Sequence, residues 1–215
     1  MEQNKYLRSF GRTKGHKLSQ NQEQIIDEFL PKIRPSQDIL KAKNIWLEIG
    51  FGAGEHIIQL ANERVDTKQV IIGCEPYING AVKVLKYIEE NKIENVFVFD
   101  GDARDLLDDI ESIEKCYILF PDPWPKKRHH KRRIVNFNTI EIIFSKLTDN
   151  GMITIATDHL GYSEWIKEVL APFKYDHSEL KTSEECRSNG ILTRYCKKAL
   201  NVGSSINRFQ ICQCH

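Results

Sequence analysis

The sequence predicts an α/β fold in which a mostly parallel sheet has helices on both faces. Short, continuous apolar runs alternate with helix-forming segments, which is typical of strands buried on both faces of a parallel sheet. A glycine-rich turn, Gly50-Phe-Gly-Ala-Gly54, follows the first apolar run and leads directly into a helix-forming segment. The predicted strands also end beside acidic residues, and ligands of such sheets bind beyond the carboxyl ends of the strands.

The predicted elements follow one another without a domain boundary along the 215 residues. A short helix over residues 20–30 is expected to end at Pro31 and Pro35. The expected strands then cover residues 45–49, 70–74, 96–99, 116–120, 152–156 and 206–211, and the expected helices cover residues 55–64, 78–91, 134–148, 161–171 and short segments after 102 and 193. We therefore predict a single domain over residues 20–215, preceded by a flexible basic arm over residues 1–19.

Composition indicates a soluble globular protein without a secretory signal. The chain is 40% hydrophobic and 28% charged, and no apolar run approaches the roughly 20 residues of a membrane-spanning helix. Its six cysteines show no disulfide pattern, so a reducing cytoplasm is expected. The only metal-like cluster is Cys212-Gln-Cys214-His215, which has no second half, so no metal site is predicted.

The glycine turn predicts a pocket for a nucleotide-type cofactor. Glycine at positions 50, 52 and 54 allows a sharp turn and the close approach of a ligand to the backbone. Glu48 precedes the turn, and Glu55 stands where a dinucleotide fingerprint has its third glycine. Carboxylates suit a cofactor with a positive charge and no phosphate, so S-adenosylmethionine fits better than NAD. The alternative is an ordinary strand-to-helix turn.

Acidic residues lie at the end of every central strand, which is the strongest indication of a site. Glu75 is placed to bind ribose hydroxyls, or else to cap the following helix. Asp102 could accept from an adenine amino group, or cap the helix that follows it. The five acids are Glu48, Glu75, Asp102, Asp122 and Asp158.

A proline-rich loop, Phe120-Pro-Asp-Pro-Trp-Pro125, follows the fourth strand. Its prolines restrict the backbone, so the loop should hold the Asp122 carboxylate in place. Trp124 offers a face for stacking on a base or a cation, although it could equally be structural.

A basic run covers residues 126–133, Lys-Lys-Arg-His-His-Lys-Arg-Arg, although the net charge of the chain is only +1. Such a run is often a solvated face. Because this one adjoins the strand ends and the N-terminal arm is also basic, we predict a surface for nucleic-acid phosphates. The expected phosphate contacts are Arg128, Lys131, Arg132 and Arg133.

Three of these motifs together resemble a known family. Glu48-Ile-Gly-Phe-Gly-Ala-Gly54, Gly101-Asp-Ala103 and the stretch FPDPWPKKRHHKRR at 120–133 are similar to those of bacterial tRNA (guanine-N7-)-methyltransferases of the TrmB type. The resemblance runs from about residue 8 to about residue 209. It implies a Rossmann-like class I methyltransferase fold with an added antiparallel C-terminal strand.

The resemblance also implies a reaction and a set of site residues. The family transfers a methyl group from S-adenosyl-L-methionine to N7 of guanine at position 46 in the variable loop of tRNA. Its cofactor acids fall on Glu48, Glu75, Asp102 and Asp122, beside the glycines Gly50, Gly52 and Gly54 of the turn. Its substrate contacts fall on Lys126, Asp158 and the segment 193–196, which includes Thr193 and Cys196. Cys196 stands where the family usually has a glutamate, so the contact to the guanine edge is the one departure. No obligatory protein partner is indicated.

The implied chemistry assigns Asp122 an orienting role. Guanine N7 carries an in-plane lone pair and no proton, so its attack on a methyl group needs positioning rather than a general base. A fixed carboxylate would stabilise the cationic product ring. Two alternatives stay open: a methyltransferase acting on an exocyclic amine of a base, and an RNA-binding module with a degenerate cofactor pocket.

Overall fold

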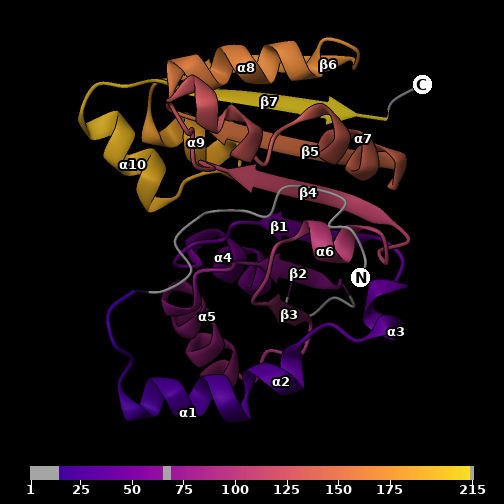
Figure 1. The fold of residues 1–215 in the computed structure, drawn as a ribbon, viewed down its shortest axis with the longest axis vertical. Coiled ribbons are helices and arrows are strands. Elements are labelled where there is room, and N and C mark those ends of the chain that lie inside the picture. Colours follow the sequence, from indigo (N-terminus) through magenta and orange to yellow (C-terminus); the bar gives the residue numbers. More distant parts are fainter. Residues whose placement is uncertain (1–14, 65–68, 214–215) are drawn as a thin grey trace.

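The computed structural model describes residues 15–64 and 69–213, which form one seven-stranded sheet with the order β3-β2-β1-β4-β5-β7-β6 (Figure 1). The strands are β1 (Ile45–Ile49), β2 (Ile71–Cys74), β3 (Val96–Phe99), β4 (Ile113–Leu119), β5 (Leu147–Thr157), β6 (Tyr175–Leu180) and β7 (Ile206–Cys212). The pairings among β1 to β5 are parallel, and β7 is antiparallel to both β5 and β6. The predicted fold class and the antiparallel C-terminal strand are therefore confirmed.

Helices cover both faces of this sheet. They are α1 (Gln20–Glu28), α2 (Leu30–Ile33), α3 (Gln37–Leu40), α4 (Glu55–Glu63), α5 (Ile78–Asn91), α6 (Arg104–Leu107), the 3₁₀ helix η1 (Lys127–Arg132), α7 (Phe137–Ser145), α8 (Leu160–Leu170), α9 (Ser183–Ser188) and α10 (Arg194–Asn201). One core cluster joins α3, α6, α7 and α8 to the sheet, and the other joins α4, α5, α9 and α10 to its opposite face. Figure 1 shows α8 and β6 at one end of the molecule and α1 at the other, where α1 is in contact with α5.

The alternation of side chains along β1 assigns its residues to the two faces. Leu47 and Ile49 pack in the cluster with α7 and α8, whereas Trp46 packs in the cluster with α4 and α5. All five residues of β1 are buried, as expected for a strand covered on both sides. Glu48 lies on the Trp46 face, so its carboxylate is directed toward the α4 side of the sheet.

Most predicted elements are confirmed with shifted ends, and the largest omissions lie near the C-terminus. The sequence did not predict β6 or α9. Strand 175–180 was missed because it is polar, lies at the edge of the sheet and lacks an apolar run. Pro31 does not end the helical region, because it occupies the first turn of α2, where its missing N–H costs no hydrogen bond. The predicted arm over residues 1–19 falls largely outside the described residues.

Candidate active site

The candidate active site is a pocket of about 660 Å³ at the point where the strand order reverses between β1 and β4. The chain runs outward from β1 through β2 to β3, then crosses back to β4, so the loops after these strands diverge and leave a crevice. The loops after β1, β2, β3 and β4 line the pocket together with the start of α10. The structure thus brings together the strand-end acids Glu48, Glu75, Asp102 and Asp122.

Two of the three glycines of the turn line this pocket, and the third packs against α5. All three have left-handed backbone angles, with φ values of 79° at Gly50, 58° at Gly52 and 84° at Gly54. Gly50 and Gly52 line the pocket. Gly54 is not among its lining residues, because it faces α5: a Cβ there would stand 2.0 Å from Cγ2 of Val84. Its predicted role as a cofactor contact is therefore replaced by the close packing of α4 on α5.

Glu48 is a nearly buried carboxylate at the edge of the pocket. Its side chain is 3% exposed, and its Oε2 lies 3.0 Å from Nδ1 of His56, which is 3% exposed itself. The His56 ring meets the ring of Tyr117 edge-on at 4.5 Å between centroids. The sequence prediction missed His56. The available signal was a histidine in the first turn of the helix that follows the glycine turn.

Glu75 braces the glycine turn. Its Oε2 accepts from the backbone N–H of Gly52 at 2.7 Å, and its Oε1 accepts from the N–H of Tyr77 at 2.9 Å. Burial raises the pKa of Glu75, and the charges of Asp122 and Glu48 act in the same direction, although the two backbone bonds oppose the shift. Glu75 also lines the pocket, so it can contact a ligand in addition to bonding the backbone of the glycine turn and of Tyr77.

Asp102 is bonded to Arg104, the first residue of α6. The guanidinium of Arg104 donates to both carboxylate oxygens, at 2.9 Å from Nε and 2.5 Å from Nη2, and the Arg104 N–H donates to Oδ1 at 3.1 Å. Asp102 is not the N-cap residue of α6, because that residue is Ala103 and it makes no side-chain cap bond. Asp102 instead bonds the backbone and the guanidinium of Arg104, the first residue of the helix. The residue still lines the pocket, where Gly101 and Ala103 lie beside it.

Asp122 stands on a strained loop between two residues with left-handed backbones. Phe120 has a φ of 52° and Trp124 a φ of 43°, values that side-chain-bearing residues rarely adopt. The Phe120 ring stacks on that of Tyr195 at 6.4 Å between centroids. In the part of the chain that the structure describes, the exposed Asp122 carboxylate has no hydrogen bond or ion pair, and it lines the pocket.

Arg133 lies beneath this loop instead of on the surface. It is 2% exposed, and its Nε donates to the carbonyl oxygen of Pro123 at 2.9 Å. Its guanidinium lies over the rings of Tyr162 and Trp165 from α8, 4.8 and 5.1 Å from their centroids. The prediction that Arg133 contacts phosphate is therefore wrong, because aromatic side chains enclose it in the fold.

The remaining cations of the basic run lie on or before η1. Lys126, Arg128 and Lys131 are exposed, as a phosphate-binding surface requires. Arg132 is half-buried, lines the pocket and lies over the Trp124 ring at 5.0 Å. Only Arg132 is among the residues that line the pocket, and the exposed Lys126, Arg128 and Lys131 continue from it along the same run, together with the exposed Lys127. We call Lys126, Arg128, Lys131 and Arg132 the basic rim, whereas Arg133 lies beneath the loop.

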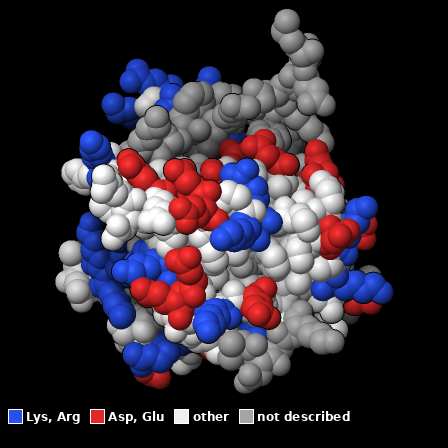
Figure 2. Space-filling view, turned by 90° about the horizontal axis from the view of Figure 1, so that it is seen from below, with Lys and Arg blue, Asp and Glu red and all other residues white. Residues whose placement is uncertain are grey.

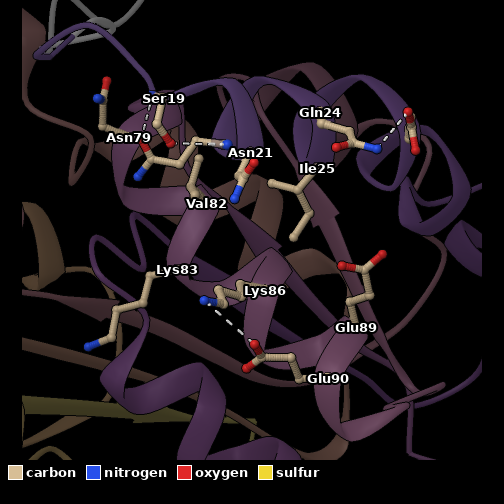
Figure 3. A pocket seen from close by; sticks show the side chains of 12 residues that line it. Ser19, Asn21, Gln24, Ile25, Asn79, Val82, Lys83, Lys86, Glu89 and Glu90 are labelled. Atoms are coloured by element: carbon tan, nitrogen blue, oxygen red, sulfur yellow. Dashed lines mark hydrogen bonds and ion pairs between the residues drawn. The ribbon is translucent and has the colours of Figure 1, made fainter.

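A second pocket, of about 700 Å³, lies between α1 and α5 (Figure 3). Its lining mixes both charges, and Lys86 pairs with Glu90 at 3.6 Å. Basic and acidic side chains are also interspersed over the face seen from the α1 end of the molecule (Figure 2). Asn79 borders both pockets and bonds the backbone of Gly15 and His16. Because helix side chains line this cavity instead of strand ends, it does not match a cofactor site.

Comparisons with known proteins agree with this geometry. A family model described as "Putative methyltransferase" matches residues 42–209. A tRNA (guanine-N(7)-)-methyltransferase of Caulobacter vibrioides is 35% identical over 205 residues, covering 90% of each chain. The chain belongs to this family. A relative of the same name from Jannaschia sp. is 36% identical over 213 residues, covering 90% of this chain and 89% of its own.

The solved structures that resemble this chain support the fold. An antibiotic-related methyltransferase superimposes with a TM-score of 0.57 at 20% identity, covering 93% of this chain and 96% of its own. Such identity is informative about architecture alone. Within residues 15–64 and 69–213, no helix is long and apolar enough to cross a membrane, and no three or more His, Cys, Asp or Glu side chains are grouped so as to hold a metal ion. The Cys214 and His215 of the metal-like cluster lie outside the described residues.

The last motif of the methyltransferase family is placed differently from expectation. Thr193 lines the pocket and caps α10, because its Oγ1 accepts from the N–H of Cys196 at 3.2 Å. Cys196 is fully buried in the core with Cys186, so the expectation that it contacts substrate is wrong. Arg194 and Tyr195 line the pocket in its place. Asp158 is exposed after β5 but is not among the residues that line the pocket.

Proposed function

We propose that this protein transfers the methyl group of S-adenosyl-L-methionine to N7 of guanine 46 in the variable loop of tRNA. Relatives named tRNA (guanine-N(7)-)-methyltransferase match this chain over nearly their whole length. The observation that carries the proposal is the meeting of four strand-end carboxylates and an aromatic pair, Trp124 and Tyr195, in one pocket beside a basic rim.

The carboxylates match the groups of the methyl donor. Glu48, at the start of the glycine turn, receives the ammonium group of the methionine portion, because a nearly buried carboxylate favours a cationic partner. Glu75 receives the ribose hydroxyls at the end of β2, in the place where sheets of this topology bind a ribose. Hydroxyl donors would also offset the burial that raises the pKa of Glu75. The Gly101–Ala103 segment forms the adenine side, with Asp102 held by Arg104.

The methyl donor supplies an electrophilic methyl group on a sulfonium, and guanine N7 supplies a lone pair without a proton. Asp122 therefore acts by position and charge rather than as a base. Its loop holds it at the pocket edge through the strained backbones of Phe120 and Trp124. The carboxylate orients the base and stabilises the positive charge that develops on the purine ring.

The rim and the aromatic residues suit the polynucleotide. Lys126, Arg128 and Lys131 are exposed cations that can pair with phosphates. Trp124 and Tyr195 line the pocket, so the site offers aromatic rings for stacking on a base. Because tRNA is processed in the cytoplasm, we expect the protein to act there.

The test is to incubate tRNA that lacks the modification with labelled S-adenosyl-L-methionine and to analyse its nucleosides. We expect 7-methylguanosine, and we expect a transcript with adenine at position 46 to accept no label. Label in N6-methyladenosine or another exocyclic amine would favour the alternative reaction. Binding of tRNA without any binding of S-adenosyl-L-methionine or transfer of label would favour an RNA-binding module with a degenerate cofactor pocket.

A further inference from the structure

Glu48 and His56 form a buried pair, and the transfer reaction described above assigns no role to His56. Glu48 Oε2 lies 3.0 Å from His56 Nδ1, and each side chain is 3% exposed. Glu48 comes from β1 and His56 from the first turn of α4, so the glycine turn joins the two partners. The same carboxylate lines the pocket, whereas His56 does not. The imidazole therefore stands behind the carboxylate, on the side away from the ligand.

His56 is itself held in place. Its ring meets Tyr117 edge-on, with 4.5 Å between centroids and 64° between planes. Tyr117 is the residue of β4 that lies opposite Glu48 in the sheet register. Burial, reinforced by the charge of Glu48, raises the pKa of Tyr117, so its phenol stays neutral and adds no second negative charge. The ring of His56 is thereby restricted to the orientation that meets Glu48.

A carboxylate this deeply buried needs a donor, because an unpaired charge in the interior is strongly disfavoured. One oxygen, Oε2, meets His56. Fixing that oxygen also fixes the plane of the carboxylate, and so the direction in which the other oxygen is presented. In metal sites, a residue that hydrogen-bonds a ligating histidine orients it and so raises the affinity for the metal. A residue that orients Glu48 should raise the affinity for its ligand in the same way.

We propose that His56 is a positioning residue that donates from Nδ1 to Glu48, and thereby sets the affinity for the ammonium group of the methyl donor. This rests on the proposed function, since it deepens the role given there to Glu48. The specific consequence is that His56 acts on one end of the ligand. Its removal should weaken ligands with the amino acid portion and leave the nucleoside portion unaffected.

The experiment measures the Kd of S-adenosyl-L-methionine and of 5′-methylthioadenosine, which lacks the amino acid portion, by calorimetry. His56→Leu should weaken S-adenosyl-L-methionine about ten-fold or more, as expected for a lost bond to a charged group. Binding of 5′-methylthioadenosine should change less than about two-fold. His56→Asn, whose amide nitrogen can replace Nδ1 as donor, should restore the affinity for S-adenosyl-L-methionine to within about three-fold of the wild type.

The Glu48→Gln background decides the mechanism. If His56 acts through Glu48, adding His56→Leu to Glu48→Gln should change the Kd of S-adenosyl-L-methionine by less than about two-fold, and the double variant also avoids a buried unpaired charge. Equal weakening of both ligands by His56→Leu, no weakening, or failure of His56→Asn to rescue would overturn the proposal. If Glu48→Gln leaves the affinity for S-adenosyl-L-methionine unchanged, then Glu48 does not bind the ammonium group. That result overturns both the role assigned to Glu48 and the positioning proposal.

Discussion

Arg133 donates from Nε to the carbonyl oxygen of Pro123 at 2.9 Å, which joins the last cation of the basic run to the loop that carries Asp122. The guanidinium lies between the loop and two aromatic rings of α8, those of Tyr162 and Trp165. The loop therefore depends on an interior arginine as well as on its prolines. This arrangement separates the supporting cation from the exposed cations of the rim.

Replacement of Arg133 should uncouple catalysis from RNA affinity. Arg133→Met should lower kcat, because the loop loses its anchor, and should lower the free energy of unfolding by about 2 kcal/mol. The salt dependence of tRNA binding should not change, since Arg133 is 2% exposed. Lys131→Met on the exposed face of η1 is the matched control and should show the reverse pattern. A reduced salt slope for Arg133→Met would return this residue to the phosphate-binding group.

Asp122→Ala should lower kcat by about 100-fold or more while the protein stays folded, because it removes the orienting charge at the pocket edge. Single-turnover transfer to one tRNA transcript is the measurement. Asp149→Ala, an exposed acid on β5, is the control and should leave kcat unchanged. Retention of more than about half of the wild-type rate by Asp122→Ala would show that this carboxylate has no such role.

Glu75→Ala should raise the KM for S-adenosyl-L-methionine far more than the KM for tRNA. The side chain supports the glycine turn through Gly52 and lines the pocket, so its loss affects both the turn and the ribose contact. The loss of bonds to a charged group corresponds to about ten-fold or more. Calorimetric titration with S-adenosyl-L-methionine measures the affinity directly. If the affinity does not change, then Glu75 does not contact the ribose, and its role is limited to its hydrogen bonds with the backbone.

The salt dependence of tRNA binding should come from Lys126, Arg128 and Lys131, the exposed cations of the rim. Replacing all three with serine should flatten the log–log slope by up to about 3 units, at roughly 0.9 per phosphate contact. The exposed Lys83 and Lys86 of α5 serve as controls, and their replacement should leave the slope unchanged. If the two sets of variants have equal slopes, then the basic run is an ordinary solvated face.

Cys196→Glu should destabilise the fold instead of improving guanine recognition, because the side chain would enter a fully buried site next to Cys186. An unpaired buried carboxylate should lower the free energy of unfolding by more than about 2 kcal/mol, measured by denaturant titration. Cys196→Ala is the control and should cost less. A stable Cys196→Glu variant with raised kcat/KM would mean that this side chain reaches the pocket after all.

The local pattern of the sequence determined the architecture and the acidic pocket. Strands such as Ile45–Ile49 are continuous apolar runs because both faces of a parallel sheet are buried, so the pattern of residues is the physical cause of the element. The glycine turn and the acids that follow the strands were also predicted, because parallel topology brings the carboxyl ends of strands to one edge. The sequence did not predict the polar edge strand 175–180, because that strand carries no continuous apolar run.

Only the tertiary structure decided which side of each segment faces the solvent. Arg133 and Lys131 are nearly adjacent in one basic run, yet Tyr162 and Trp165 of α8 enclose the first and leave the second exposed. Cys196 is buried because α10 packs against the core, and His56 meets Glu48 because the glycine turn folds α4 back against β1. Burial depends on the neighbours that a distant segment supplies, and residue type and spacing within one segment do not encode those neighbours.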